Sequence, residues 1–245
     1  MKQYRDILEK QLALDYDCSV EDVRSEENIF KPIKLVEGAR PICDEETMFK
    51  LAVYKEKLLV MADENILAWC KERFGEYTGT WISEPGNLLE IEEELNKYGQ
   101  TIADTHHYYL PVTQDECDEE RFETKIYRQN EIDRFEDDDR FGEAILFDED
   151  TPDEIAVVAM DGETILGMAG ATHDTDTMWQ IGVNVTKEGR GKGVGSYVIK
   201  RLKNEVLKCG IVPFYATVES HIKSQKVAIR AGFEPTFYEL FSEPK

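Results

Sequence analysis

The C-terminal half of the sequence predicts an α/β (α+β) fold, in which helices pack on a sheet. A strand-like alternation over 178–185 passes into the glycine-rich segment 189–195 and then into helical spacing of apolar residues from Ser196. The pair Asp161-Gly162, typical of a tight hairpin turn, separates two further apolar runs. Strand and helix periods therefore alternate along one continuous stretch, as they do when both kinds of element share a core.

The elements of this half are expected in the order strand, two short helices, three strands, helix, strand, helix and strand. Alternating apolar residues predict the strands, and apolar residues three and four positions apart predict the helices. The segments are strand 122–128, short helices at 131–135 and 141–147, strands 155–160, 164–171 and 178–185, a helix from 196, a strand from 212, a short helix, and a last strand from the pair Gly232-Phe233.

Residues 1–120 are predicted to form a separate N-terminal α/β accessory domain. Segments 1–14 and 65–74 have helical periodicity, whereas 58–61 and 108–112 are short apolar runs typical of strands. The segment 114–120, QDECDEE, is polar and acidic and has the composition of a linker. We therefore place the domain boundary between residues 120 and 121.

Composition and charge exclude several classes of protein. The formal net charge of −22 repels nucleic acid and anionic membrane surfaces and favours cationic partners. No run approaches the roughly 18–20 apolar residues of a membrane helix, and no apolar segment of a signal peptide follows the first ten residues. The five cysteines are scattered without C-x-x-C spacing, so we expect neither a disulfide framework nor a metal site. We expect a cytoplasmic protein, and the sequence leaves open whether it forms a homodimer.

The glycine-rich segment is the strongest functional signal. Glycines at every second position from Gly189 to Gly195 permit tight turns and close approach of the backbone to a ligand. The following helix start offers unpaired N–H groups to an anion, and Arg190 and Lys192 add positive charge in an otherwise acidic protein. These features predict a phosphate-binding loop. The alternative is a glycine-rich turn between strand and helix that binds no ligand.

The spacing is neither G-x-G-x-x-G nor that of a P-loop. It is R-x-x-G-x-G, carried by Arg190, Gly193 and Gly195, and the downstream segment 212–235 ends in Gly232-Phe233. Together these segments resemble the GNAT superfamily of N-acetyltransferases, over about residues 121–245. The resemblance implies a GNAT fold, with a mixed, mostly antiparallel central sheet flanked by helices, and acetyl-CoA as cofactor. The chain is similar to a bacterial branch with its own N-terminal domain, which is either a degenerate copy of the fold or a lid.

The resemblance also implies which residues contact the cofactor. The end of the motif strand would lie beside the pantetheine arm, and the loop would surround the pyrophosphate. In the later helix, the family's Asn position falls on His221, its Ala/Ser position on Ser224, and its usual Tyr, the general acid, on Ala228. His221 is either a cofactor contact or a helix-start residue. The implied cofactor-binding residues are Val183, Asn184, Val185, Arg190, Gly191, Lys192, Gly193, Val194, Gly195, Ser196, His221 and Ser224.

Candidates for proton transfer and acceptor binding lie near the strand ends. Glu219, His173 and Asp174 are the candidate catalytic bases, although each is also an ordinary turn or surface residue. Gln180 and Asn184 on the motif strand are further candidates. Asp137, Asp138 and Asp139 are predicted to attract a cationic acceptor, the alternative being a solvated acidic loop.

These observations predict direct transfer of an acetyl group from acetyl-CoA to an amine, with a cationic small molecule as acceptor. Two alternatives remain open at this point. In the first alternative, the acceptor is a protein or peptide amine. In the second, the chain is an acyl-CoA-binding module that has lost its catalytic activity. The second alternative is motivated by the absence of a hydroxyl at Ala228.

Overall fold

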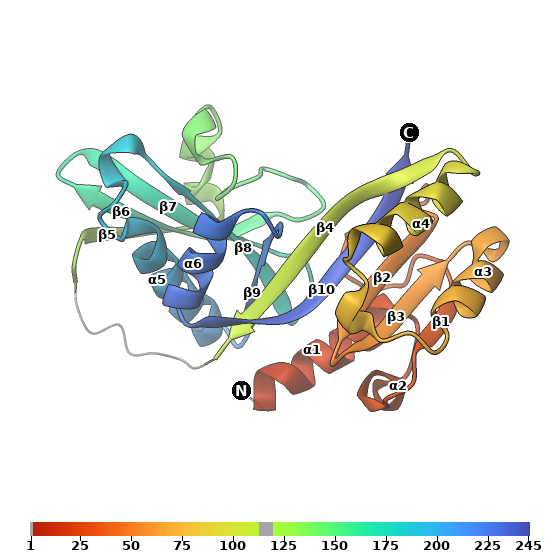
Figure 1. The fold of residues 1–245 in the computed structure, drawn as a ribbon. Coiled ribbons are helices and arrows are strands. Elements are labelled where there is room, and N and C mark those ends of the chain that lie inside the picture. Colours follow the sequence, from red (N-terminus) through yellow and green to blue (C-terminus); the bar gives the residue numbers. More distant parts are fainter. Residues whose placement is uncertain (1, 113–119) are drawn as a thin grey trace. The chain divides into compact units, whose positions relative to one another are not determined.

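The computed structural model describes residues 2–112 and 120–245 and divides into two compact units (Figure 1). The C-terminal unit comprises Tyr109–Pro235 together with the start of the chain up to Tyr4. The N-terminal unit comprises Arg5–Tyr108 and, from the other end of the chain, Thr236–Lys245. Most of the predicted linker 114–120 lies outside the described residues, next to the boundary predicted at 120/121.

The C-terminal unit is built on a mixed, mostly antiparallel sheet. Its strands β5 to β8 pair in sequence order as antiparallel neighbours, and β9 adds to β8 in parallel. This confirms the predicted fold class. A parallel neighbour requires a crossover, which helix α5 provides. The elements are β5 (Glu123–Arg128), β6 (Asp153–Asp161), β7 (Thr164–Thr172), β8 (Met178–Val185), α5 (Val194–Lys208), β9 (Val212–Thr217) and α6 (Ile222–Arg230).

Apolar side chains cover both faces of this sheet. On one face Ile181 of β8 packs with Val198 and Leu202 of α5 in a core that also includes residues of α6. On the other face Phe141 and Met168 belong to a second cluster, formed with the segment that joins β5 to β6. Strands buried on both faces and an amphipathic helix explain why local periodicity predicted these elements well; β8 has the predicted bounds.

The two short helices predicted after the first strand are wrong. The structure has 3₁₀ turns there, at Gln129–Glu131, Asp133–Phe135 and Asp139–Phe141. Starting an α-helix fixes several residues for one hydrogen bond, so short segments form helices only when their residues favour them. Four consecutive acidic residues, Glu136 to Asp139, repel one another at this point, and aspartate is a weak helix former.

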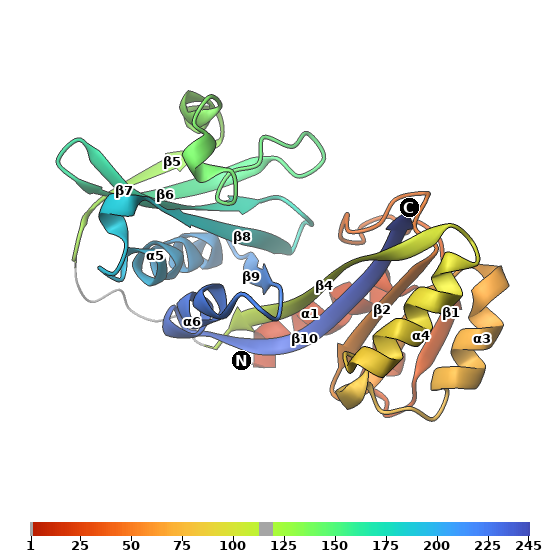
Figure 2. The same ribbon diagram turned by 45° about the horizontal axis from the view of Figure 1, so that its top comes forward.

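The strands of the N-terminal unit pair in the order β1, β3, β2, β10, β4. Helices α3 and α4 contribute to a core on one face, with strand residues such as Leu51 and Leu240. Figure 2 shows α3 and α4 beside the strands of this unit. The elements are α1 (Lys2–Asp15), α2 (Val20–Arg24), β1 (Ile29–Pro32), β2 (Phe49–Tyr54), β3 (Lys57–Ala62), α3 (Glu64–Phe74), α4 (Pro85–Asn96), β4 (Gln100–Pro111) and β10 (Phe233–Pro244).

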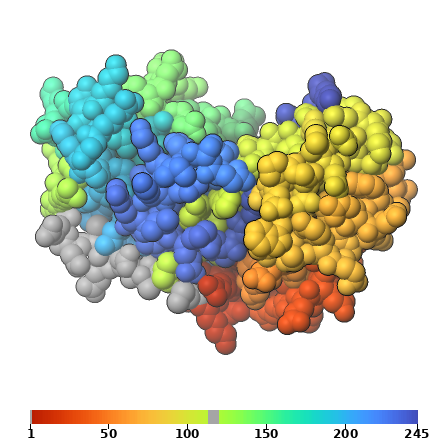
Figure 3. Space-filling model, viewed as in Figure 1, coloured from red at the N-terminus to blue at the C-terminus, as the bar shows by residue number. Residues whose placement is uncertain are grey.

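The last strand of the chain completes the sheet of the N-terminal unit. Residues Phe237–Phe241 of β10 pair antiparallel with β2, from Tyr54 back to Lys50. At the end of the strand Lys245 N donates to Gly99 O at 3.0 Å, and Figure 3 shows this blue tip against the yellow-green surface. The segment 236–245, assigned from sequence to the C-terminal domain, therefore belongs to the compact N-terminal unit.

A buried ion cluster fixes this strand within the unit. Arg40 Nε lies 2.6 Å from Asp15 Oδ2, and Arg40 Nη2 lies 2.7 Å from Glu239 Oε1, with the three side chains at most 1% exposed. The guanidinium carbon of Arg40 also lies 5.3 Å from the ring centre of Tyr108 and 5.1 Å from that of Phe237. Helix α1, the segment around Arg40 and β10 are thus joined by charge-assisted hydrogen bonds in a dry environment.

Glu239→Gln is expected to lower the free energy of unfolding by about 3–5 kcal/mol, because it leaves the buried Arg40 without one of its two carboxylates. Glu243→Gln, an exposed change on the same strand, is the control and is expected to change it by less than about 0.5 kcal/mol. Urea denaturation followed by circular dichroism measures both. Equal effects of the two substitutions would show that the ion cluster does not hold the strand.

Candidate functional site

The glycine-rich loop leads directly into the N-terminus of α5. Gly191 and Gly193 have φ values of +75° and +79°, a region in which side chains other than that of glycine are strained. Gly193 is the N-cap of α5, and no side chain caps the first turn. The first N–H groups of the helix therefore remain available to an anion, together with the partial positive charge of the helix end.

Other glycines in this region serve close packing. A Cβ atom at Gly189 would lie 2.1 Å from Leu166 O of β7, and one at Gly167 would lie 2.8 Å from Val194 Cγ1 of α5. Thr186 Oγ1 donates to Leu166 O at 3.0 Å and fixes the chain where it leaves β8. The loop is thus held against β7 before it reaches the helix.

Three cations surround the loop, one of which sequence analysis missed. Arg190 and Lys192 are exposed on the loop itself. Arg121 Nη1 lies 3.2 Å from the position that a Cβ of Gly193 would occupy. Within the described part of the chain, no carboxylate forms an ion pair with these three side chains. Arg121 carried no local sequence signal, because only the folded sheet brings the start of β5 beside the loop.

Strands β8 and β9 part next to this loop. Their last paired residues are Ile181 and Tyr215, but β8 continues to Val185, paired only with β7 on its other edge. The backbone edge of β8 from Gly182 onward is therefore not paired with β9. Gly195 in the first turn of α5 packs here, since a Cβ atom would lie 3.3 Å from Val185 Cγ2. The structure thus places Val183 to Val185 and the predicted loop residues Arg190 to Ser196 around one gap.

The side chain of Asn184 has a structural task. Its Oδ1 accepts hydrogen bonds from the N–H groups of Glu143 and Ala144, each at 2.8 Å. The same segment packs directly on two glycines of the sheet. A Cβ atom at Gly182 would lie 1.7 Å from Glu143 O, and a Cβ atom at Gly170 would lie 1.9 Å from Ala144 O, so neither position has room for a side chain. Asn184 therefore positions the segment 143–144 over β8 through its amide oxygen.

The hydroxyl of Tyr215, the last residue of β9 that pairs with β8, contacts helix α6. Tyr215 Oη and Ser224 Oγ are 2.7 Å apart. Burial raises the pKa of Tyr215, and the charge of Glu143 raises it further, while the hydrogen bond with Ser224 opposes the shift. Ala228 is fully buried in the core and contributes no hydroxyl. Tyr215 is thus a proton donor that sequence analysis missed, because the family pattern directed attention to position 228.

The three predicted bases do not form one cluster. His173 Nδ1 lies 3.1 Å from Glu154 Oε1, and Asp174 Oδ2 accepts from Thr172 Oγ1 at 2.9 Å and from Gln180 N at 2.8 Å, so both belong to the turn before β8. Glu219 follows β9. Because β8 and β9 are parallel, residues before one strand and after the other lie at opposite ends of the pair.

His221 is the N-cap residue of α6, where its exposed side chain makes no capping hydrogen bond. The structure is therefore compatible with both roles considered for it, a helix-start residue and a cofactor contact. Ser224, in contrast, is half-buried and engaged with Tyr215. Its hydroxyl lies on the face of α6 that is turned toward β9.

The three aspartates predicted to attract a cationic acceptor, Asp137, Asp138 and Asp139, lie near an acidic cavity but do not line it. Asp138 Oδ2 binds Arg140 Nη2 at 2.6 Å, and this hydrogen bond lowers the pKa of Asp138, while Asp137 and Asp139 are exposed. A neighbouring cavity of about 590 Å³ opens between the β5–β6 connection and the start of β6. Its six carboxylates belong to Asp133, Glu136, Asp148, Glu149, Asp153 and Glu154.

A protein-family model described as the acetyltransferase (GNAT) family matches residues 106–233 of this chain. The chain belongs to the GNAT acetyltransferase family. A GCN5-related N-acetyltransferase from Sphaerobacter thermophilus has 14% sequence identity and a TM-score of 0.50, with 97% of this chain and 91% of that chain covered. A GCN5-related N-acetyltransferase-like protein from Streptococcus suis has 15% identity and a TM-score of 0.49, covering 82% and 85%. At 14% identity the likeness to the Sphaerobacter thermophilus protein shows the GNAT fold alone.

A search of curated proteins found no match. Over residues 2–112 and 120–245, no helix has the length and apolar character needed to cross a membrane. Within the same ranges, no group of three or more His, Cys, Asp or Glu side chains is arranged to hold a metal ion.

Gly193→Trp is expected to weaken acetyl-CoA binding by about tenfold or more, because the side chain would occupy the space between the loop and Arg121. Gly210→Trp is the matched control. Gly210 has a φ of +80°, similar to that of Gly193, so the backbone strain is comparable, but it lies beyond the other end of α5 with open space around it. Calorimetric titration measures both affinities, and equal affinities would contradict this assignment of the loop.

Proposed function

We propose that this GNAT protein is an acetyl-CoA-dependent N-acetyltransferase that transfers the acetyl group directly to the amine of a cationic small molecule. The observation that carries the proposal is the gap between β8 and β9 beside the uncapped start of α5. One edge of the gap offers unpaired strand backbone, and its mouth offers helix N–H groups and three cations. This combination suits a ligand with a phosphate end and an extended, amide-containing arm.

The residues present fit coenzyme A. The N–H groups of the α5 first turn, with Arg190, Lys192 and Arg121, would hold the pyrophosphate, and the free edge of Val183 to Val185 would bond to the pantetheine amides. Positive φ at Gly191 and Gly193 keeps this surface free of side chains. When bound, acetyl-CoA supplies the acetyl thioester. Positioning the two reactants contributes on the order of 7–11 kcal/mol to such a reaction.

Proton transfer is assigned to residues near the parting of the strands. A tyrosine hydroxyl is protonated at neutral pH, and burial raises the pKa of Tyr215 further, so its proton is available to a departing thiolate. Ser224 Oγ, at 2.7 Å, orients it. A protonated alkyl amine loses its proton at a cost of about 4.6 kcal/mol at pH 7. We assign the acceptance of that proton to the exposed carboxylate of Glu143, because its charge acts on Tyr215 and its backbone lies on Gly182.

The charge of the protein supports a cationic acceptor. Six carboxylates line the 590 Å³ cavity in the C-terminal unit, on the side of the β5–β6 connection, and the whole chain carries a net charge of −22. Such a field concentrates cations and repels anionic substrates. A protein or peptide amine is the alternative acceptor. An acyl-CoA-binding module without turnover is the non-enzymatic alternative, motivated by the buried Ala228.

Thiol release from acetyl-CoA, measured with a panel of polyamine, aminoglycoside, monoamine and peptide acceptors, tests the proposal. We expect turnover with polycationic small amines and a KM that rises with salt, since ions screen the attraction. Binding of acetyl-CoA without turnover on any amine would support the non-enzymatic module and exclude the enzyme. Turnover on peptides alone would exclude the small-molecule acceptor.

Tyr215→Phe is expected to lower kcat by about tenfold to a hundredfold while leaving acetyl-CoA affinity unchanged, because it removes only the acidic proton. Ser224→Ala is the control, since it breaks the same hydrogen bond but keeps the phenol. Because the pKa of Tyr215 is raised, its proton is present throughout the neutral range, and kcat/KM of the native protein should rise with pH as the acceptor deprotonates. An unchanged kcat for Tyr215→Phe would remove this residue from the mechanism.

A further inference from the structure

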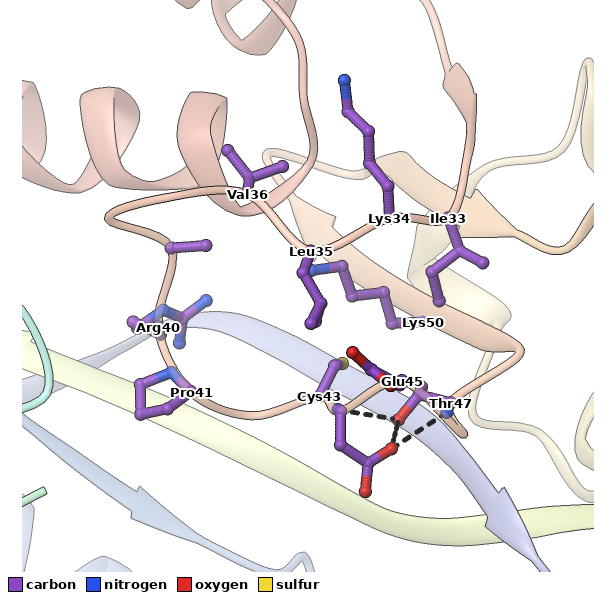
Figure 4. Close-up of a pocket in the computed structure, with 12 residues that line it drawn as sticks. Ile33, Lys34, Leu35, Val36, Arg40, Pro41, Cys43, Glu45, Thr47 and Lys50 are labelled. Atoms are coloured by element: carbon purple, nitrogen blue, oxygen red, sulfur yellow. Dashed lines mark hydrogen bonds between the residues drawn. The ribbon is translucent and has the colours of Figure 1, made fainter. Parts of the chain in front are cut away.

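The N-terminal unit contains a cavity of its own, far in sequence from the glycine loop. It has a volume of about 520 Å³, within the range of cavities that bind small molecules. Two segments form it, the residues from Ile33 to Val36 and those from Ala39 to Thr47, with Lys50 of β2 (Figure 4). All of these residues belong to the N-terminal unit.

A buried lysine is the unusual feature of this cavity. Lys50 is only 4% exposed, and its Nζ lies 5.1 Å from the ring centre of Tyr16. In Figure 4 its side chain extends between the two lining segments. Among the described residues, none accepts a hydrogen bond from this amine and no carboxylate forms an ion pair with it. The stem of this lysine is therefore buried while the residue lines the cavity, where an anionic group could accept hydrogen bonds from its amine.

The other two cations of the lining are already engaged, since Lys34 Nζ lies 2.8 Å from Asp17 Oδ2 and Arg40 belongs to the buried ion cluster. Arg40 is bound by Asp15 and Glu239, and Asp44 Oδ1 accepts from Thr47 N at 3.0 Å and from Thr47 Oγ1 at 3.1 Å. The buried ion cluster carries two carboxylates and one guanidinium, and among the described residues no ion pair joins Lys50 to it.

We propose that this cavity binds a small carboxylic acid anion with an apolar body, its carboxylate on the amine of Lys50. One unengaged cation matches one negative charge, and the carboxylates of Asp44 and Glu45 in the lining disfavour a dianion or a phosphate. Burial raises the pKa of the Cys43 thiol to about 11, so this group stays neutral. The apolar body would pack on the aliphatic lining residues, which are Ile33, Leu35, Val36, Ala39 and Pro41.

Calorimetric titration of the full chain with hexanoate, hexanamide and hexylamine tests the proposal. Hexanoate is expected to bind, whereas the neutral amide of the same shape should bind about tenfold more weakly or worse, and the amine should not bind. Lys50→Met is expected to weaken hexanoate binding by about tenfold or more, and Lys71→Met, an exposed change outside the cavity that removes the same charge, should alter it by less than about twofold.

Two further measurements do not depend on the stability of the Lys50 variant. Leu35→Trp, at a cavity residue that is 59% exposed, should obstruct the cavity and weaken binding without disturbing the ion cluster. In the native chain, hexanoate should slow acylation of Lys50 by acetic anhydride, read by mass spectrometry, and leave Lys71 unaffected. Equal binding of hexanoate and hexanamide, or no protection of Lys50, would overturn the proposal. No readout requires acetyl-CoA or turnover, so the result is independent of the proposed acetyltransferase activity.

Discussion

The site depends on where the pairing of β8 with β9 stops. The two strands are hydrogen-bonded as far as Ile181 and Tyr215, and β8 then continues along β7 alone. A strand edge that is left unpaired inside a protein needs another partner for its N–H and C=O groups. In this chain the free edge begins beside the first turn of α5. The unpaired N–H and C=O groups of β8, which suit an extended amide arm, therefore lie next to the helix N–H groups, which suit a phosphate.

Glycines make this arrangement possible in two physically different ways. Gly191 and Gly193 adopt positive φ values, which lets the loop present its backbone without side chains. Gly170 and Gly182 instead provide a flat surface on the sheet, on which the segment 143–144 lies so closely that a methyl group would not fit. The first pair shapes the mouth of the site, and the second pair sets the position of Glu143 above β8.

The N-terminal unit is organised around buried charge. Arg40 joins Asp15 and Glu239, which come from widely separated parts of the chain, and thereby fixes the terminal strand in the sheet of this unit. Buried ion pairs stabilise only when their hydrogen bonds are satisfied, and the Arg40 cluster meets this condition through bonds from Nε and both Nη atoms. Lys50, close to the same cluster, differs because its amine faces a cavity.

The sequence by itself determined the strand–loop–helix unit around the glycine motif and the strands β6 to β8, because their periodicity and turn residues act over a few neighbouring positions. The same dependence on neighbouring residues explains which features the sequence did not predict. The ion cluster that holds β10 and the approach of Arg121 to Gly193 carry no local pattern. Only the tertiary structure decided that Tyr215 meets Ser224, that Asn184 holds the segment 143–144, and that His173 and Glu219 lie at opposite ends of a strand pair. Strand order and register create these distances, and a single sequence encodes them only through the packing of the whole chain.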